Sequence, residues 1–387
     1  MEMKLLNSKL PKSGLSIFSR MTSLALKNDA VNLAQGFPDF PCPGELSEAL
    51  YRATQEGYNQ YGPMPGFLPL RENISKRIQN TYSVQIDAQE EITITAGATQ
   101  GVYSAISTLV SPGDKVIIFE PAYDSYAPSV LVNKGEPIYI RLEEPEFKIP
   151  WDKLEQSLRT QEIRLILFNN PHNPTGVIWE EEDFQKLISL LHFQKPLMIW
   201  DEVYDAMVYD GKKHLSALQY PELYESSIVT FSFGKTFHNT GWKIGYNIAP
   251  PHLTAEFRKL HQFTLFSVNY PSQVASSYFL ERNFDFIKDL SSFYQKKRDH
   301  MINLLKQTEF NALSCSGSYF LLASHEAMQR MGDIGFADHI VENNKVALIP
   351  LSAFYHDGYD PHLLRFCFAK KESTVEQAVE RLKRPTF

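Results

Sequence analysis

Short apolar runs that end in polar residues recur through the middle of the chain. Each run is rich in Ile, Val, Leu or Phe and has the length of a strand, which predicts strands buried on both faces. These runs cover residues 91–95, 115–120, 164–170, 196–202 and 227–233. Segments between them carry apolar residues at helical spacing, as in 180–193 with Phe184, Leu187, Ile188 and Leu191. The pattern therefore predicts strands that alternate with amphipathic helices.

Strands that alternate with helices are typical of an α/β fold with a mainly parallel sheet covered by helices on both faces. From about residue 285 the pattern changes to a long helix around 289–307, three short strands and a final helix. This second pattern indicates a smaller α+β domain. We expect a large domain over residues 41–284 and a small domain formed by 1–40 together with 285–387.

Composition and charge narrow the class of protein further. Of the 387 residues, 43% are hydrophobic and 21% are charged, which is ordinary for a globular chain. The net charge of -7 argues against a nucleic-acid partner, because such proteins usually carry a basic excess. Three widely separated cysteines do not suggest a disulfide framework. Residues 1–18 lack the apolar core of a signal peptide, so we expect a cytoplasmic protein with no membrane partner.

Several residues with chemical potential follow directly after the predicted strands. In open parallel sheets, ligands bind outside the carboxyl ends of the strands, where the loops meet. We therefore expect one site that contains the residues at these ends: Gly97, Tyr123, Asn173, Asp201 and Lys235.

The segment 232–246, SFGKTFHNTGWKIGY, raises several competing interpretations. Its Ser-x-x-Lys spacing matches the start of a penicillin-binding or β-lactamase site, but the companion Ser-Asp-Asn and Lys-Thr-Gly motifs are absent. Its Gly-Lys-Thr could end a phosphate-binding P-loop, but Val229 stands where that motif needs its first glycine. Without a P-loop, Asp201 has no role as a magnesium ligand of a nucleotide site.

Pyridoxal phosphate is the cofactor that this combination of residues suits. It needs a lysine for a Schiff base, a carboxylate at its ring nitrogen and donors around its phosphate. Lys235 suits the first role because burial and nearby positive charge lower the pKa of an amine. Asp201 suits the second role, and the strand-to-helix turn at 95–106 suits the third. On these grounds alone a structural Lys-Asp pair remains an open alternative.

A family resemblance extends over nearly the whole chain. Its motifs occur in order as NLAQGFPDFPCP, QYGPMPG, ITAGATQGVYSAI, EPAYDSYAP, NNPHNPTG, DEVYD, SFGKTFHNTGWKIGY and LRFCFAKKES. The chain resembles the class I aminotransferases of fold type I. That resemblance implies a large domain with a mainly parallel seven-stranded sheet and pyridoxal 5'-phosphate as cofactor. Within the family, the motifs are most similar to the bacterial methionine aminotransferases and to the kynurenine aminotransferase and glutamine transaminase K group.

The resemblance implies a role for each residue around the cofactor ring. Lys235 would bind the cofactor covalently and move the proton, and Asp201 would pair with the ring nitrogen. Asn173 and Tyr204 would hydrogen-bond the ring hydroxyl, and Tyr123 would stack on the ring face.

The resemblance also implies a phosphate site. The backbone of Gly97, Ala98 and Thr99 would donate hydrogen bonds, and Ser232 and Lys243 would supply side chains. Many relatives carry arginine where Lys243 stands. Lysine offers a point charge in place of two parallel hydrogen bonds, so the strength of this contact is open.

The remaining implied residues concern the substrate and the partner subunit. Arg365 would hold the α-carboxylate of the amino acid, with Gly36 and Asn173 as further substrate contacts and Phe37 as a wall of the side-chain pocket. Tyr61 would reach the phosphate of the neighbouring subunit, which implies a homodimer with shared sites.

The function expected from this set is aminotransfer from methionine or another large neutral or aromatic L-amino acid to a 2-oxo acid, with ping-pong kinetics. The aromatic segments around Phe18, Phe37 and 263–270 contain no obvious basic residue for an acidic side chain. Two alternatives use the same scaffold: a kynurenine or glutamine transaminase, and a cysteine-S-conjugate β-lyase.

Overall fold

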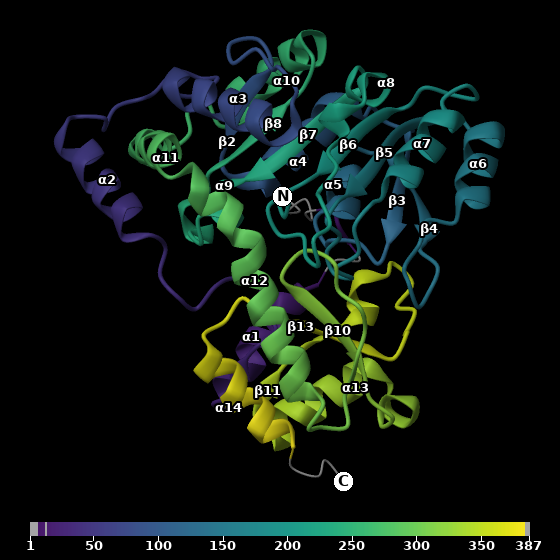
Figure 1. Ribbon diagram of the computed structural model, residues 1–387. Coiled ribbons are helices and arrows are strands. Elements are labelled where there is room, and N and C mark those ends of the chain that lie inside the picture. The colour runs from purple at the N-terminus through teal and green to yellow at the C-terminus, as the bar shows by residue number, and fades with distance from the viewer. Residues whose placement is uncertain (1–6, 12–13, 384–387) are drawn as a thin grey trace, which may run out of the picture.

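The computed structural model describes residues 7–11 and 14–383 (Figure 1). Its main feature is a seven-stranded sheet. In spatial order the strands are β2 (Ile92–Thr95), β8 (Gly245–Ile248), β7 (Ser227–Ser232), β6 (Leu197–Asp201), β5 (Ile163–Asn169), β3 (Lys115–Glu120) and β4 (Glu136–Arg141). The five strands predicted from apolar runs are confirmed, and their ends differ from the predicted ends by at most one residue.

The sheet is mainly parallel, as predicted. β4, β3, β5, β6 and β7 pair in parallel, and β8 pairs antiparallel with both β7 and β2. Only β8 therefore runs against the others within this sheet. The apolar-run criterion missed β4 and β8. β4 is a partly exposed edge strand that contains a proline, and β8 has only four residues and begins with glycine.

Helices cover both faces of this sheet because successive strand residues point to opposite sides. On one face, Val116 and Ile118 pack with helices α4 (Gly97–Leu109), α5 (Tyr126–Val132) and α10 (Pro251–Thr264). On the other face, Ile117 and Phe119 belong to a core that also contains α3 (Leu68–Tyr82), α6 (Trp151–Thr160) and α7 (Glu181–Leu190). The strands are thus buried on both sides, which explains their continuous apolar sequence.

Two small sheets lie below the large one in Figure 1. In the first, β1 (Val31–Asn32) pairs in parallel with β11 (Val346–Ala347). The second has the order β12 (Ile349–Pro350), β13 (Leu363–Cys367), β10 (Phe320–Ser324) and β9 (Asn311–Ala312). Helix α1 (Ile17–Lys27) packs against β11 and β12, so residues 17–27 fold together with strands from the C-terminal part of the chain.

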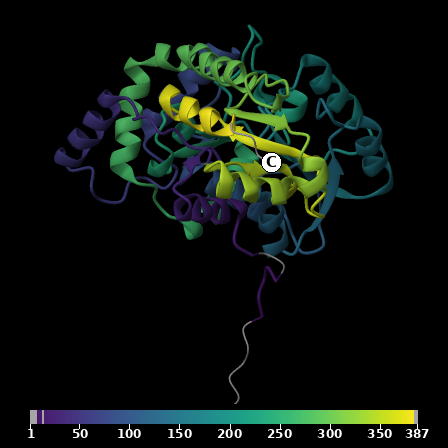
Figure 2. The same cartoon turned by 90° about the horizontal axis from the view of Figure 1, so that it is seen from below.

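Helix α12 (Phe284–Leu305) runs from the level of the large sheet down to the small sheets (Figure 1). Seen from below, it lies beside the yellow C-terminal helix α14 (Glu372–Leu382) (Figure 2). The other helices are α2 (Gly44–Gln55), α8 (Pro221–Tyr224), α9 (Phe233–Thr236), α11 (Tyr270–Arg282), α13 (Met328–Asn343) and the 3₁₀ turns η1 (Ala217–Gln219), η2 (Thr240–Trp242) and η3 (Leu351–Phe354).

Within the described part of the chain, no helix combines the length and the apolarity that a bilayer span requires. The same residues contain no group of three or more His, Cys, Asp or Glu side chains placed to hold a metal ion. Of the N-terminal stretch 1–18, residues 1–6 and 12–13 lie outside the described ranges.

Candidate active site

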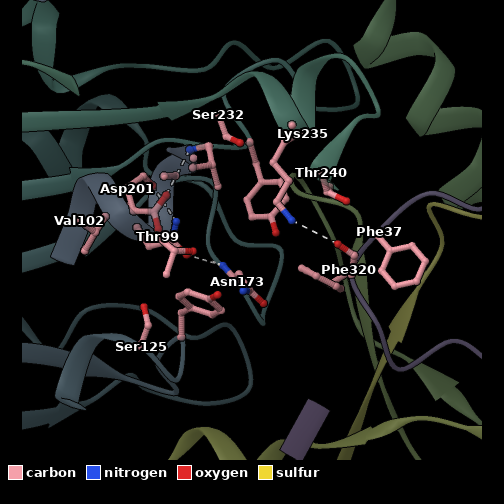
Figure 3. Close-up of a pocket in the computed structure, with 18 of the residues that line it drawn as sticks. Phe37, Thr99, Val102, Ser125, Asn173, Asp201, Ser232, Lys235, Thr240 and Phe320 are labelled. Atoms are coloured by element: carbon pink, nitrogen blue, oxygen red, sulfur yellow. Dashed lines mark hydrogen bonds between the residues drawn. The ribbon is translucent and has the colours of Figure 1, made fainter. Parts of the chain in front are cut away.

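A cavity of about 280 Å³ opens at the carboxyl edge of the large sheet. Every site residue named from the sequence lines it, with the exception of Tyr61. The lining residues from that set are Gly36, Phe37, Gly97, Ala98, Thr99, Tyr123, Asn173, Asp201, Tyr204, Ser232, Lys235, Lys243 and Arg365. Figure 3 shows several of these side chains pointing into the same space.

The strand directions bring these residues together. β2, β6 and β7 are mutually parallel, so the positions at their ends, Gly97, Asp201 and Lys235, share one edge. Asn173 lies in the loop after β5. Because β8 runs the other way, Lys243, which precedes it, reaches the same edge. Arg365 comes from β13 of the small sheet, which approaches from the opposite side.

Lys235 sits in the single turn of α9 directly after the buried strand β7. Its Nζ donates to the hydroxyl of Tyr319 at 2.6 Å and to the carbonyl of Gly36 at 3.2 Å (Figure 3 shows the second contact). Burial lowers the pKa of this amine to about 8, and the positive charges of Arg365 and Lys243 act in the same direction. About a tenth of Lys235 is therefore neutral, and able to act as a nucleophile, at pH 7.

Asp201, the last residue of β6, lines the cavity. Its side chain is only 7% exposed and accepts hydrogen bonds from the Tyr126 hydroxyl at 2.6 Å and from the Val203 amide at 3.4 Å. Burial raises the pKa of this carboxyl, while the Tyr126 hydrogen bond and the charge of Lys235 lower it. A cationic partner in the cavity would hold Asp201 ionised, because opposite charges favour the charged form.

The first turn of α4 has the character of an anion site. Its N-cap residue is Ala96, which offers no side chain to the first amide groups of the helix. Gly97 follows with a φ of +75°, and a Cβ there would lie 3.3 Å from Nζ of Lys243. Ser232 stands on the same wall. A helix N-terminus without a side-chain cap and the amino group of Lys243 thus converge on one region.

Arg365 forms the opposite wall and is 1% exposed. One Nη donates to Asn173 Oδ1 at 2.8 Å and the other to the Ala34 carbonyl at 2.9 Å. Its guanidinium lies 3.8 Å from the centre of the Phe320 ring. Burial lowers the pKa of Arg365 to about 10, so it remains a cation at neutral pH, and its Nε has no hydrogen-bond partner among the described residues.

Gly36, Phe37 and Tyr61 occupy different surroundings. A Cβ on Gly36 would lie 2.5 Å from the Phe320 ring, so only glycine fits there. Phe37 is 42% exposed at the rim of the cavity. Tyr61 is 81% exposed and lies outside the cavity. Its ring packs edge-on against Phe266, with 5.3 Å between the two ring centres.

Several residues of the site were not identified from the sequence. Tyr126 binds Asp201, Asn169 Oδ1 accepts from the amide of Asn173 at 2.7 Å, and Tyr319 binds Lys235. Tyr126 lies within the family motif EPAYDSYAP and Asn169 within NNPHNPTG, so the family resemblance could have identified both as site residues. Tyr319 gave none, since a tyrosine before an apolar strand looks like an ordinary core residue.

Comparison with known proteins agrees with this arrangement. Residues 28–382 match the family described as aminotransferase class I and II. The chain belongs to this family. The predicted membership, enzyme class and fold are thereby confirmed, and pyridoxal 5'-phosphate is the cofactor of such aminotransferases.

Individual relatives extend the likeness over almost the full length. The chain is 42% identical to the methionine aminotransferase of Escherichia coli, over 97% of both sequences. It is 32% identical to the kynurenine–oxoglutarate transaminase of Dictyostelium discoideum, over 95% of this chain and 94% of that one. A solved Escherichia coli structure described as having a methionine aminotransferase function superposes with a TM-score of 0.95, at 42% identity, over 99% of this chain and 100% of the other.

The residues of this aminotransferase fit pyridoxal phosphate. The cavity pairs a lysine of lowered pKa with a buried carboxylate, and the uncapped first turn of α4 stands beside Lys243. Amine, carboxylate and anion site are the three features that the cofactor requires. The lining also includes Tyr123, an aromatic side chain that a planar ring could stack against.

Proposed function

We propose that this aminotransferase takes the amino group from methionine or another large neutral or aromatic L-amino acid and gives it to a 2-oxo acid. The observation that carries the substrate preference is the distribution of charge in the cavity. Its cationic lining residues are Lys235, Lys243 and Arg365, counted over the described chain. Each has a role at the cofactor or at the α-carboxylate, so none is left for an acidic side chain.

The proposed substrate pocket is aromatic. Phe18, Phe37 and Phe320 line the cavity, and the ring centres of Phe18 and Phe320 lie 5.2 and 3.8 Å from the guanidinium carbon of Arg365. Apolar walls of this kind favour a thioether, phenyl or indole group over a carboxylate, because an unpaired charge is costly to bury. Such walls distinguish a single methylene by only about 1 to 3 kcal/mol, so we expect several large amino acids to be accepted.

The proposed cofactor contacts follow the geometry of the site. Asp201 would pair with the ring nitrogen, Asn173 and Tyr204 with the ring hydroxyl, and Tyr123 with the ring face. The phosphate would bind the first turn of α4, with Ser232 and Lys243 as side-chain partners. The bound cofactor supplies an electron sink for the substrate carbon.

The chain's own residues then have distinct tasks. Arg365 would hold the substrate carboxylate through two parallel hydrogen bonds and so orient the Cα–H bond. Lys235, neutral in part near pH 8, would take the Cα proton on Nζ and return it. Asp201 would stay ionised against a positive partner and keep that end of the cavity polar.

A donor panel tests this proposal. The purified enzyme should be yellow because its bound cofactor has a visible absorption band. This band should disappear when methionine or phenylalanine is added and return when a 2-oxo acid is added. Aspartate should be at least tenfold poorer in kcat/KM, because its second carboxylate meets an apolar wall. A protein that prefers aspartate, or that binds no pyridoxal phosphate, would contradict the proposal.

The same panel separates the alternatives. Kynurenine is a second candidate donor, favoured by the likeness to a kynurenine–oxoglutarate transaminase. A higher kcat/KM for kynurenine than for methionine would support it. Release of pyruvate and ammonia from a cysteine conjugate without an added oxo acid would indicate β-lyase activity.

We infer further that the enzyme is a cytoplasmic homodimer whose subunits share active sites. The exposed Tyr61 and its neighbour Phe266 support this, because exposed aromatic pairs are typical of interfaces. Mixing Tyr61→Ala chains with Lys235→Ala chains should restore activity, since each hybrid dimer would keep one intact site. Hybrids without activity would contradict shared sites.

We also infer two domains, one formed by residues 41–284 and the other by residues 1–40 together with 285–387.

A further inference from the structure

The hydroxyl of Tyr319 binds the reactive amine of Lys235. Tyr319 lies immediately before β10, far from Lys235 in sequence, and its side chain is fully buried. Its Oη accepts a hydrogen bond from Lys235 Nζ at 2.6 Å and donates one to the carbonyl of Gly36. The Gly36 carbonyl also accepts from Lys235 at 3.2 Å. Amine, hydroxyl and carbonyl therefore form a closed triangle.

The direction of these hydrogen bonds follows from the number of hydrogen atoms that each group can donate. A tyrosine hydroxyl carries one hydrogen, and a carbonyl oxygen accepts only. The hydroxyl of Tyr319 gives its hydrogen to Gly36, so the side facing Lys235 presents a lone pair. Lys235 thus meets two acceptors and no donor in this triangle. Two acceptors stabilise an ammonium more than a neutral amine.

The surroundings hold the Tyr319 hydroxyl in one place. The ring packs edge-on against Tyr204 at 5.0 Å and Phe320 at 4.9 Å between ring centres. Its backbone carbonyl accepts from the Phe368 amide at 3.1 Å. The Gly36 backbone packs against the Phe320 ring with no room for a side chain, which fixes the carbonyl that orients the hydroxyl. The acceptor is thus preorganised by packed residues.

We propose that Tyr319 is a positioning residue that holds the free amine of Lys235 in the cavity and raises its proton affinity. The proposal deepens the proposed function and rests on the role of Lys235 there. Whenever Lys235 is free, its flexible side chain would otherwise sample several rotamers. The Tyr319 hydroxyl restricts it to one and opposes the effect of burial, so the amine can carry the proton it accepts.

Other charged and titratable groups around Lys235 also influence the protonation of its amine. Those that face its amine from the surrounding elements are Asp201, Tyr204, Lys243, Arg365, Cys367 and Tyr319. Of these, only Tyr319 makes a hydrogen bond with Nζ, counted over the described residues. A substitution confined to its hydroxyl therefore removes this hydrogen bond, together with the hydroxyl's interaction with the Tyr204 side chain, and leaves the other charged groups in place.

The test measures how fast Lys235 reacts with acetic anhydride as a function of pH, by peptide mass spectrometry. The full chain is used both free of cofactor and loaded with pyridoxamine 5'-phosphate, since Lys235 is a free amine in both. Removing a hydrogen bond to a charged group should move the labelling midpoint of Tyr319→Phe about one pH unit below that of the wild type.

Tyr294→Phe is the matched control. Tyr294 is also buried, its ring centre lies 5.9 Å from that of Tyr319, and its hydroxyl has no hydrogen-bond partner among the described side chains. Its loss should leave the labelling midpoint unchanged. With the holoenzyme, Tyr319→Phe should lower kcat about tenfold with KM within twofold, because the hydroxyl acts on Lys235 and not on the substrate.

A Tyr319→Phe midpoint equal to that of the wild type, or shifted upward, would overturn the proposal. Circular dichroism checks the fold of each variant. If Tyr319→Phe does not fold, 3-fluorotyrosine at position 319 takes its place, because it keeps the hydroxyl but weakens it as an acceptor. An unshifted labelling midpoint of Lys235 in that variant would also overturn the proposal. The labelling needs no turnover, so its outcome is independent of the donor panel that tests the proposed function.

Discussion

Two lysines eight residues apart, Lys235 and Lys243, illustrate how residue surroundings set residue chemistry. Lys235 lies on a single helical turn and meets the acceptors of Tyr319 and Gly36. Lys243 has a left-handed backbone with a φ of 56° and extends beside the first turn of α4. The residue type is the same, but one amine faces the centre of the cavity and the other faces its anion site.

This difference gives a prediction for Lys243→Ala. The variant should bind pyridoxal phosphate about tenfold to a hundredfold more weakly, because a charged hydrogen bond contributes about 1.5 to 3 kcal/mol. Turnover at saturating cofactor should fall much less. Titration of cofactor-free protein, followed by absorbance, gives the affinity.

Lys243→Arg is the control for charge, and it should keep most of the affinity because a guanidinium also binds phosphate. Equal cofactor affinity in the wild type and in Lys243→Ala would show that Lys243 does not contact the phosphate.

At the scale of elements, the connection from β2 to α4 prepares the anion site. The chain leaves the strand at Thr95 and enters the helix at Gly97 through a φ of +75°. Residues with a Cβ adopt this conformation at a cost of about 1 to 2 kcal/mol. The turn therefore depends on glycine both for its backbone and for the space that Lys243 occupies.

Gly97→Ala should lower the affinity for pyridoxal phosphate at least tenfold, because the added methyl group strains the turn and would lie only 3.2 Å from Cε and 3.3 Å from Nζ of Lys243, closer than ordinary van der Waals contact. Gly113→Ala provides a matched control. Gly113 also has a positive φ, of +88°, but has open space around it. Both variants should lose about 1 kcal/mol of stability through strain. Only Gly97→Ala should lose cofactor affinity, and a similar loss in both would contradict the assignment.

At the scale of the whole molecule, burial of histidines links stability to pH. His172, in the loop after β5, and His261, on α10, are both buried. Burial lowers the pKa of each to about 4 from an ordinary value near 6.5. Between these values the unfolded chain binds a proton that the folded chain does not.

Stability should therefore fall as the pH drops from about 6.5 to 4, by about 1.4 kcal/mol per pH unit for each of these histidines. Thermal unfolding of the cofactor-free protein across this range measures the effect. His261→Gln should make the dependence shallower, whereas replacement of the exposed His192 should not. An unfolding midpoint that stays constant between pH 6.5 and 4 would exclude this account.

Much of the fold could be predicted because the local pattern of apolar and polar residues marks the central strands. The central strands are continuous apolar runs, and burial on both faces makes such runs necessary. The edge strand β4 and the short β8 have weaker patterns and depend on neighbours for their place in the sheet. Their existence followed only from the family resemblance. The domain limits at residues 41 and 285 stay a prediction.

The sequence by itself determined which residues stand at the strand ends, and therefore that Asp201 and Lys235 would meet. It also determined the family, through ordered motifs along nearly the whole chain. Only the tertiary structure decided that Tyr126 binds Asp201 and that Tyr319 binds Lys235. These hydrogen bonds join segments about 75 or more residues apart, and they depend on rotamers and packing that no local pattern encodes.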